Sequence, residues 1–565
     1  MKESVKSMKK NYSILFLIYL VGVIIYLGII YLFTIPVHLS VDEELYISMA
    51  RSFHYDGVFA KNGDILNYSC VLYSMILSIA YFFYSPCNIL YALRTLNVII
   101  MLSSIFPIFL LGNSILKNEK KALVISAFSM LLPTMMNTAY CMQETLAYPL
   151  FLWMTYFIYR EIEKDKLLVI SKESIVISVL SIVCYFTKTY MIFIPLVYCG
   201  VVFLEALIKK NLNVWKKLVV FCAILIGLYC LGKYGILCIN NGVEGVNHYA
   251  SQFSRLFPIT GQTMIAAISC MIVYFVGLLF YWGIIPVILP LCNYKKYEEK
   301  DRKFFSFLFL SICVLIVEIV LSIVLTEEGN VLAPKKILYR YFQILEIPIF
   351  LIFLNGIEKL EFPKKMWAVY VSVLGILAVY FFYIGDGQRT AIIDAPVYLL
   401  MENVTRYVFP YFNILVCILA AGIVGMGAWL HSRKKWDTKV LLIAFKRLGI
   451  VCIVAFFVVN LLQLPYYSNT IADGRRIEED SIKIANYLIE DETHSDIYFV
   501  TTESDRYERA VYAYLNENII YVSREKIKHL SDKNAVVIVS SKCDLGENFQ
   551  EIELSTEVLG IVKLK

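Results

Sequence analysis

Two adjacent carboxylates, Asp42 and Glu43, stand in the polar run SVDEELYISMAR at residues 40–51. A carboxylate held where membrane meets water can take a proton from a hydroxyl group, so Asp42 is a candidate general base. The run also fits an ordinary helix start, because Ser40 and Glu43 have the spacing of a capping box and acids favour helix N-termini. Apolar residues recur at helical spacing as far as Phe53, which predicts a short amphipathic helix on the membrane surface.

Three further charged residues stand at the ends of apolar runs. Glu144 starts one run, and Lys188 lies between two others with no charge near it. Arg340 lies between Tyr339 and Tyr341, shortly before another run. A helix-start preference and snorkelling are the alternative explanations for Glu144 and Lys188. An arginine grips two phosphate oxygens with its planar fork, so Arg340 and Lys188 predict a phosphate contact.

The chain around these residues has the composition of a membrane protein. Of its 565 residues 59% are hydrophobic and 17% are charged, against roughly 45–50% apolar and about 25% charged in soluble proteins. Apolar runs of roughly 18–25 residues recur along most of the chain, which is the length a helix needs to cross a bilayer. This excludes a soluble enzyme, a disordered chain and a nucleic-acid binder. The 14 cysteines include no CxxC pair, and they predict neither a disulfide framework nor a metal cluster.

Lysines and arginines gather in alternate loops, which fixes the orientation of the runs. We predict about 13 transmembrane helices in the cell membrane, with the N-terminus in the cytoplasm and the C-terminus outside. The predicted spans are 13–35, 88–116, 120–140, 144–160, 172–187, 189–208, 218–238, 263–291, 303–325, 338–356, 366–384, 406–431 and 448–465. In this topology the carboxylates and both cations fall on the outer side. Together they suit a hydroxyl nucleophile and a phosphate leaving group.

One apolar run does not fit the topology as a crossing. Residues 67–84 would invert every later loop, so we expect them to lie along the outer interface or to re-enter the membrane. An ordinary span with a shifted neighbour is the alternative.

The composition changes near residue 468. A helical pattern at 473–490 is followed by short strand-like runs at 497–500, 519–522 and 535–540. We therefore predict a transmembrane domain over residues 1–465, with its first outer loop at 36–66. A small extracytoplasmic α/β domain follows over residues 466–565.

The pattern resembles the C-type glycosyltransferase (GT-C) superfamily, closest in style to the protein O-mannosyltransferases and the lipid A aminoarabinose transferases. Those proteins carry a DE pair in the first outer loop, then an aromatic residue and a small-residue/arginine element. Asp42-Glu43, Tyr46 and Ala50-Arg51 match these.

Later elements match more loosely. Glu144 stands where these proteins have an acid at an outer helix start, Lys188 follows an aromatic stretch, and Arg340-Tyr341 precedes a proline-containing span. The lysine-proline element that follows the first loop of the aminoarabinose transferases is missing, and residues 67–69 stand in its place.

The resemblance implies a GT-C-like polytopic helical enzyme of the bacterial cell envelope. It would move one sugar from a polyprenyl-phosphate donor to a hydroxyl on an envelope glycan, lipid or protein, by inverting direct displacement. By analogy Asp42 is the base and Glu43 and Glu144 orient acceptor or sugar, while the two cations stabilise the departing phosphate. The implied catalytic residues are Asp42 and Glu43, and the implied substrate-binding residues are Glu144, Lys188, Arg340, Tyr341 and Tyr46. Relatives differ in whether they use a divalent cation, and we assign no metal ligand.

Two other classes of function remain as alternatives. A flippase or transporter for a lipid-linked sugar should have charged residues in mid-span and paired halves. Glu318 and Glu346 are the main charges of that kind, and no symmetry between halves is evident. A polysaccharide polymerase or ligase would share the outer basic residues but would rely on a large outer loop.

Overall fold

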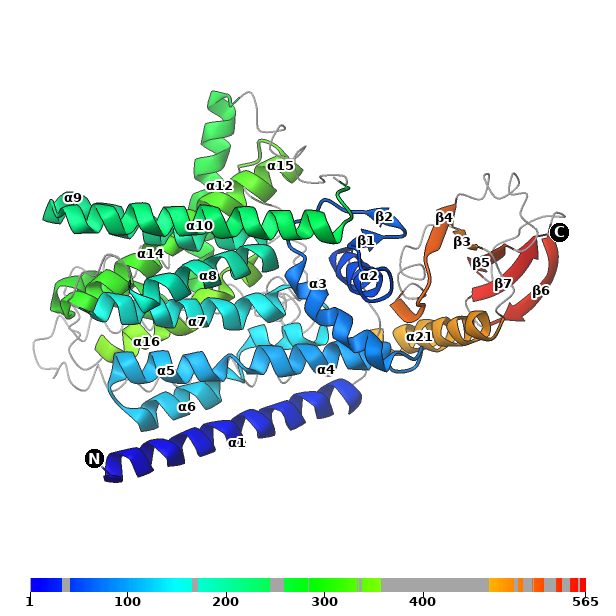
Figure 1. Cartoon of the computed structure of the whole chain (residues 1–565), viewed down its shortest axis with the longest axis horizontal. Helices are drawn as coiled ribbons and strands as arrows, with labels where there is room; N and C mark the ends of the chain where they lie inside the picture. Colours follow the sequence, from blue (N-terminus) through cyan, green and yellow to red (C-terminus); the bar gives the residue numbers. More distant parts are fainter. Residues whose placement is uncertain are drawn as a thin grey trace, which may run out of the picture.

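The computed structural model describes residues 2–32, 41–164, 171–243, 259–282, 284–332, 334, 338–356, 467–491, 496–500, 511, 513–522, 535–540, 549–556 and 559–564. Most described helices run side by side in a bundle, and a sheet lies beyond one end of it (Figure 1). The predicted spans at 366–384, 406–431 and 448–465 lie outside the described residues.

The first half of the bundle is α1 (Lys2–Leu32), α4 (Ile89–Leu102), α5 (Ile105–Leu116), α6 (Glu119–Ser129), η2 (Pro133–Ala139), α7 (Glu144–Glu163), α8 (Lys172–Thr187), η3 (Thr189–Ile192), α9 (Phe193–Lys209) and α10 (Leu212–Ile239). The second half is α12 (Gly261–Tyr281), α13 (Ile284–Cys292), η4 (Tyr294–Lys296), α14 (Glu299–Ile319), the π-helical turn η5 (Val320–Val324), α15 (Leu325–Glu328), η6 (Tyr339–Tyr341), η7 (Gln343–Leu345) and α16 (Glu346–Gly356).

The chain is a multi-pass membrane protein. Within the described ranges, six helical stretches are long and apolar enough to cross a bilayer: Asn11–Tyr31, Ile89–Leu116, Thr189–Ile208, Leu212–Ile239, Gly261–Leu279 and Glu299–Val324. In α1 and α10 only 17% of the apolar window is buried. Such exposed apolar surface is stable in lipid and costly in water.

Several predicted spans are not single continuous helices, and the count of 13 is not confirmed. The expected helix at 120–140 is wrong, because α6 ends at Ser129 and η2 begins at Pro133. Leu132 has φ −67° and ψ 147°, the extended backbone that a following proline favours. The predicted span 338–356 is likewise divided into η6, η7 and α16, and 263–291 into α12 and α13.

The 67–84 run forms two short helical segments. They are α3 (Leu72–Leu77) and η1 (Ser78–Phe83), each of six residues. Their combined length is about 20 Å, shorter than the ~30 Å hydrocarbon core that a spanning helix must cross. The run packs against α2, and its interfacial or re-entrant placement stays a prediction.

The segment predicted to be the first outer loop contains a helix, as its spacing predicts. The helix is α2 (Val41–Asp56), and the hairpin of β1 (Ala60–Lys61) and β2 (Asp64–Ile65) follows it. Its placement differs from an amphipathic helix lying on the membrane surface, because nearly every residue from Glu43 to Ser52 is buried. One face packs on α3 and η1, and the polar face contacts the C-terminal part of the chain.

The C-terminal part combines the long helix α21 (Tyr467–Glu490) with a five-stranded sheet. Its strands are β3 (Ile497–Val500), β4 (Ile519–Val522), β5 (Val536–Ser540), β6 (Phe549–Ser555) and β7 (Leu559–Leu564), in the order β4-β3-β5-β7-β6. The pairs β3–β4 and β3–β5 are parallel, and the pairs β5–β7 and β6–β7 are antiparallel. This small sheet domain and helix fit the predicted α/β domain.

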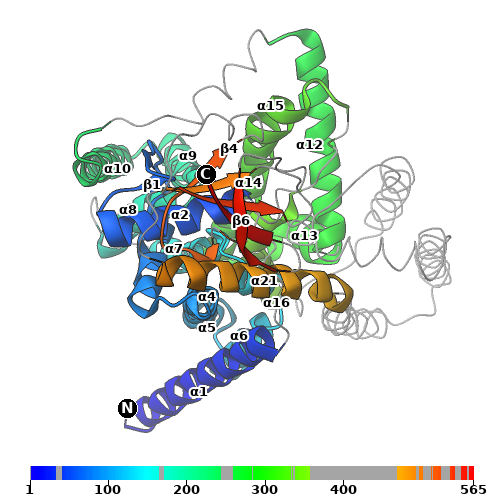
Figure 2. The same cartoon turned by 90° about the vertical axis from the view of Figure 1, so that its right-hand side faces the viewer.

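Arg51 of α2 joins the helical bundle to the C-terminal part of the chain. Seen end-on, α21 and the sheet lie in front of the bundle (Figure 2). Its guanidinium donates to the carbonyl oxygens of Leu515 at 3.3 Å and Glu517 at 2.6 Å, and to Asn518 Oδ1 at 2.9 Å. Tyr84 Oη also donates to the Tyr514 carbonyl at 2.8 Å. The first outer loop is therefore held between the bundle and the C-terminal sheet.

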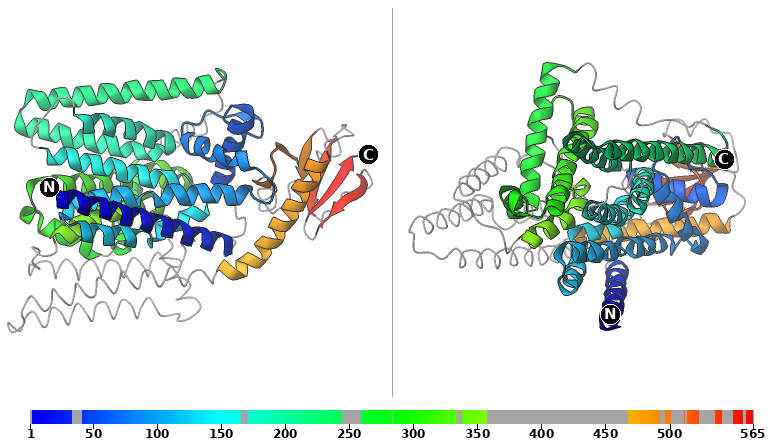
Figure 3. Two further views of the ribbon diagram at one scale, coloured as in Figure 1. Left: turned by 60° about the horizontal axis from the view of Figure 1, so that its bottom comes forward. Right: turned by 60° about the vertical axis from the view of Figure 1, so that its left-hand side comes forward.

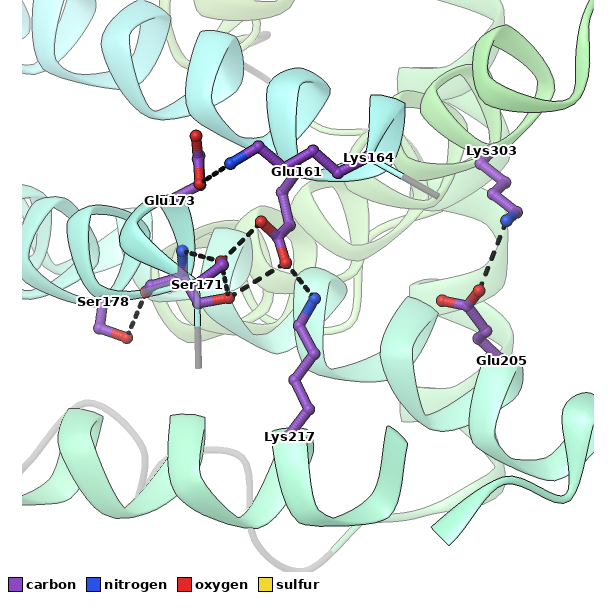
Figure 4. A network of polar contacts seen from close by, with 9 residues as sticks. Glu161, Lys164, Ser171, Glu173, Ser178, Glu205, Lys217 and Lys303 are labelled. Atoms are coloured by element: carbon purple, nitrogen blue, oxygen red, sulfur yellow. Dashed lines mark hydrogen bonds and ion pairs between the residues drawn. The ribbon is translucent and has the colours of Figure 1, made fainter. Parts of the chain in front are cut away.

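The opposite end of the bundle is tied by a separate buried network (Figure 4). Glu161 of α7 pairs with Lys217 of α10, and Ser171 Oγ donates to the same carboxylate at 2.6 Å. Lys303 contacts Glu205 at 3.4 Å nearby. The start of α1 and the C-terminal sheet also lie at opposite ends of the bundle (Figure 3).

Candidate active site

A buried carboxylate and two cations meet at the start of α7. Glu144 Oε1 accepts a hydrogen bond from Lys188 Nζ at 2.5 Å, and it lies 3.4 Å from Arg340 Nε. Glu144 is 4% exposed and Lys188 is 8% exposed. Residues from three distant segments, each predicted from sequence, therefore form one ion cluster. An acid at the head of an apolar helix is stable here because it is paired.

The backbone explains how each cation reaches the cluster. Lys188 lies between α8 and η3 with φ −155° and ψ 123°, so the helix stops at this residue. Arg340 lies in the short turn η6, and its neighbour Tyr339 packs closely on α12. A Cβ atom on Gly277 of α12 would lie 2.1 Å from Tyr339 Oη. Glycine at this position lets η6 approach the bundle.

The rings of Tyr341 and Tyr190 lie beside the cations of the cluster. The Lys188 ammonium lies 4.8 Å from the ring centroid of Tyr341 and 5.3 Å from that of Tyr190. The Arg340 guanidinium carbon lies 5.2 Å from the Tyr341 ring. The two rings meet edge to face with centroids 4.7 Å apart. Cation–π contacts therefore hold both cations beside Glu144.

Glu43 and Asp42 are neighbours in sequence but have different environments. Glu43 is 3% exposed, and its Oε1 accepts the backbone N–H of Cys141 at 2.8 Å. Because Cys141 lies three residues before Glu144, where α7 begins, this bond ties the start of α2 to the start of α7. Asp42 is exposed, and its carboxylate has no hydrogen-bond or ion-pair partner among the described residues. Of the pair, Asp42 is the one accessible to solvent.

Tyr73 of α3 interacts electrostatically with both Glu43 and Glu144. Burial raises the pKa of Tyr73 well above its usual value, and the carboxylates of Glu43 and Glu144 both add to the rise. Its hydroxyl donates to Asn97 Oδ1 at 2.9 Å. The carboxylate held by α2 and the ion cluster of α7 therefore belong to one region of the molecule.

Tyr46, a predicted substrate-binding residue, lies in the packed interior of the loop. Its ring meets that of Tyr73 edge to face with centroids 5.8 Å apart, and it is 4% exposed. The geometry gives Tyr46 a packing contact between α2 and α3, and its contact with substrate stays a prediction.

Two residues without a motif also belong to this region. The Tyr190 hydroxyl and Glu318 Oε2 are buried without a hydrogen-bond partner in the described part of the chain. The Glu318 carboxyl group interacts electrostatically with Tyr190, and the π-helical turn η5 follows it in the chain. The signal for Glu318 was its charge within an apolar span, which commonly marks a functional site. Among the described residues no His, Cys, Asp and Glu side chains group as metal ligands.

The fold is similar to that of solved glycosyltransferase structures. ArnT from Cupriavidus metallidurans in the apo state aligns with a TM-score of 0.52 and 12% identity, covering 99% of this chain and 98% of ArnT. The same protein bound to undecaprenyl phosphate aligns with a TM-score of 0.53 and 11% identity, with the same coverage of both chains. No protein-family model matches the sequence, and no curated protein matches it. The expected GT-C-like membrane fold is confirmed, and at this identity the likeness is one of fold.

Proposed function

We propose that the chain is a membrane glycosyltransferase that moves a single sugar from a polyprenyl-phosphate donor to a hydroxyl acceptor on the outer face, by inverting direct displacement. The observation that carries the proposal is the buried cluster of Glu144, Lys188 and Arg340. It lies beside the acidic start of α2 in a fold shared with an ArnT that binds undecaprenyl phosphate.

The charge of the cluster suits such a donor. Lys188 and Arg340 carry two positive charges, and Glu144 carries one negative charge. This surplus of positive charge attracts the negative charge of a prenyl-phosphate-sugar diester. As the sugar leaves, negative charge grows on the phosphate, and fixed cations in a buried site stabilise that charge strongly.

We assign the role of general base to Asp42, and the support for this is its exposed carboxylate at the start of α2. In the proposed step the acceptor oxygen bonds to the anomeric carbon while its proton moves to the Asp42 carboxylate. The bond from the anomeric carbon to the phosphate oxygen breaks, and its electron pair stays on the phosphate. Attack opposite the leaving group inverts the anomeric centre. Glu43 acts as a positioning residue, because its carboxylate is bound to the backbone of Cys141.

The remaining assignments follow from the predicted topology. The N-terminus lies in the cytoplasm, and the site and the domain at residues 466–565 face the outside. The acceptor is an envelope glycan, lipid or protein of a bacterial cell. The C-terminal domain contacts α2 through Arg51, which supports a role for that domain beside the acceptor.

Asp42→Asn tests the proposal, with Asp56→Asn at the exposed far end of the same helix as its matched control. Purified protein is given undecaprenyl-phosphate-linked glucose, mannose or arabinose with an envelope extract as acceptor, and release of undecaprenyl phosphate is measured. We expect release by the wild type and by Asp56→Asn, and a loss of about 100-fold or more in Asp42→Asn. Release at the wild-type rate by Asp42→Asn would contradict the assigned base.

The lipid-linked sugar flippase is the alternative that one observation favours, since Glu318 is a charged group inside a span. A flippase moves the labelled lipid across vesicles without releasing undecaprenyl phosphate. Translocation without release, unchanged in Asp42→Asn, would favour it over the transferase. A polymerase or ligase would release undecaprenyl diphosphate from a different donor.

A further inference from the structure

Lys233 is a charged residue inside the apolar helix α10. Its stretch, Leu212–Ile239, has the hydropathy of a membrane span. The Lys233 ammonium donates to Ser69 Oγ at 2.6 Å, and it has no carboxylate partner among the described residues. A cation in a span is costly unless it is paired or used, and a neutral hydroxyl does not balance its charge.

The segment that Lys233 contacts adjoins the ion cluster. Gln143, the residue before Glu144, donates through Nε2 to the Cys70 carbonyl at 3.0 Å. Cys70 Sγ contacts the carbonyl of Tyr185, near the end of α8, at 3.6 Å. Cys70, the residue after Ser69, therefore bridges the two helices whose ends carry Glu144 and Lys188.

The environment of Cys70 shows that two cations lie near one side chain. Burial raises the pKa of the Cys70 thiol to about 12, while the backbone of Thr189 and the charges of Lys188 and Lys233 act against the rise. Both ammonium groups therefore lie close enough to Cys70 to act on it.

The end of α10 is fixed on the first outer loop. Buried Asn240 donates from Nδ2 to the Leu66 carbonyl at 3.1 Å, and its Oδ1 accepts the backbone N–H of Phe59 at 3.0 Å. This clamp lies two helical turns beyond Lys233 and holds α10 against the segment that carries Ser69. Lys233 is therefore held in position beside the loop.

We propose that Lys233 is a third cation for the donor phosphate, which it binds together with Lys188 and Arg340. The inference rests on the proposed function and assigns a residue to its phosphate subsite. The ligand chemistry is a phosphate monoester or diester at the membrane boundary. Because the bilayer also offers headgroup phosphates, the test separates the prenyl phosphate from an ordinary anionic lipid.

The test measures binding of undecaprenyl phosphate to the purified full-length protein in detergent, with undecaprenol and phosphatidylglycerol as comparison ligands. Lys233→Gln keeps a donor for Ser69 but removes the charge, and Lys233→Arg keeps the charge. Ser69→Ala removes the hydrogen bond and leaves the charge. Lys216→Gln changes an exposed lysine near the other end of the same helix.

We expect Lys233→Gln to weaken undecaprenyl phosphate binding about tenfold or more, because a charge-assisted contact is lost. Lys233→Arg, Ser69→Ala and Lys216→Gln should bind it as the wild type does. Undecaprenol binding should not change in Lys233→Gln.

Three results would overturn the inference. The first is undecaprenyl phosphate affinity in Lys233→Gln equal to that of the wild type. The second is a loss equal to that in Ser69→Ala, which would make Lys233 a structural tether. The third is an equal loss of phosphatidylglycerol binding, which would assign Lys233 to bulk lipid. If the wild type does not prefer undecaprenyl phosphate to undecaprenol, the proposed function itself fails, and this inference fails with it.

Discussion

Replacing Glu144 by glutamine tests how the charge of the site is balanced. In the native protein this carboxylate lies 2.5 Å from Lys188 Nζ and 3.4 Å from Arg340 Nε. Glu144→Gln removes the negative charge that the buried Lys188 and the partly buried Arg340 share. Removing one partner of a buried ion pair costs about 3–5 kcal/mol. We therefore expect a clearly lower melting temperature for the variant in detergent without ligand.

Affinity for the donor phosphate should change in the opposite direction. A phosphate bound on the far side of the Lys188 ammonium would lie about 5–6 Å from the Glu144 carboxylate, given the 2.5 Å contact on the near side. Two negative charges at that separation repel by about 3 kcal/mol at an effective dielectric constant of about 20. Glu144→Gln should thus bind undecaprenyl phosphate up to about 100-fold more tightly.

The other end of α7 provides a matched control. Glu161 forms a similar buried pair with Lys217. Glu161→Gln should also lower the melting temperature but should leave undecaprenyl phosphate affinity unchanged. The double variant Glu144→Gln/Lys188→Gln should recover stability relative to Glu144→Gln, because the charge surplus returns to its native value. Titration followed by thermal unfolding measures both quantities. Weaker phosphate binding in Glu144→Gln, or equal effects of both single variants, would refute the electrostatic reasoning.

Three other changes have distinct expected outcomes. Arg51→Ala removes the hydrogen bonds to residues 515–518 and should weaken the contact with the C-terminal part by about 1.5–3 kcal/mol. Hydrogen exchange of the backbone amides at 515–518 should therefore rise. Unchanged exchange would contradict the role of Arg51 in holding the C-terminal part against α2. Glu318→Gln should keep or raise the melting temperature, because a buried carboxyl group without a hydrogen-bond partner destabilises the fold. The same variant should lower the rate of sugar transfer. A lower melting temperature would instead indicate that Glu318 has a structural partner. In Gly277→Ala the new Cβ atom would overlap the Tyr339 hydroxyl, so Tyr339 should be displaced. Because Arg340 is its neighbour in η6, undecaprenyl phosphate binding should be reduced. Binding equal to that of the wild type would show that η6 tolerates the displacement of Tyr339.

The sequence predicted the elements whose pattern is local. The strands at 497–500 and 519–522 have the predicted bounds, because short β-branched and aromatic runs flanked by polar residues determine them. The strands β6 and β7 were not predicted. The sequence of β6, FQEIELS, carries two acids and lies at the edge of the sheet, where the partner strand decides its structure.

In the candidate site, too, the sequence predicted what is local and did not predict which distant residues meet. Charge in the loops places Glu144, Lys188 and Arg340 at one end of the bundle, but their meeting in one ion cluster depends on where α8 breaks and where η6 packs. The different environments of Asp42 and Glu43 depend on Cys141, which is nearly 100 residues away. The role proposed for Lys233 could not be predicted from the sequence for the same reason, because its neighbours Ser69 and Cys70 lie in a distant segment of the chain.

A cryo-EM structure with bound undecaprenyl phosphate tests the central claim most directly. We predict phosphate oxygens within hydrogen-bond distance of Lys188 and Arg340, with the Asp42 carboxylate on the same side of the bundle as the phosphate. Phosphate density at the Glu161 end of α7, or Asp42 on the opposite side of the bundle from the phosphate, would contradict the account.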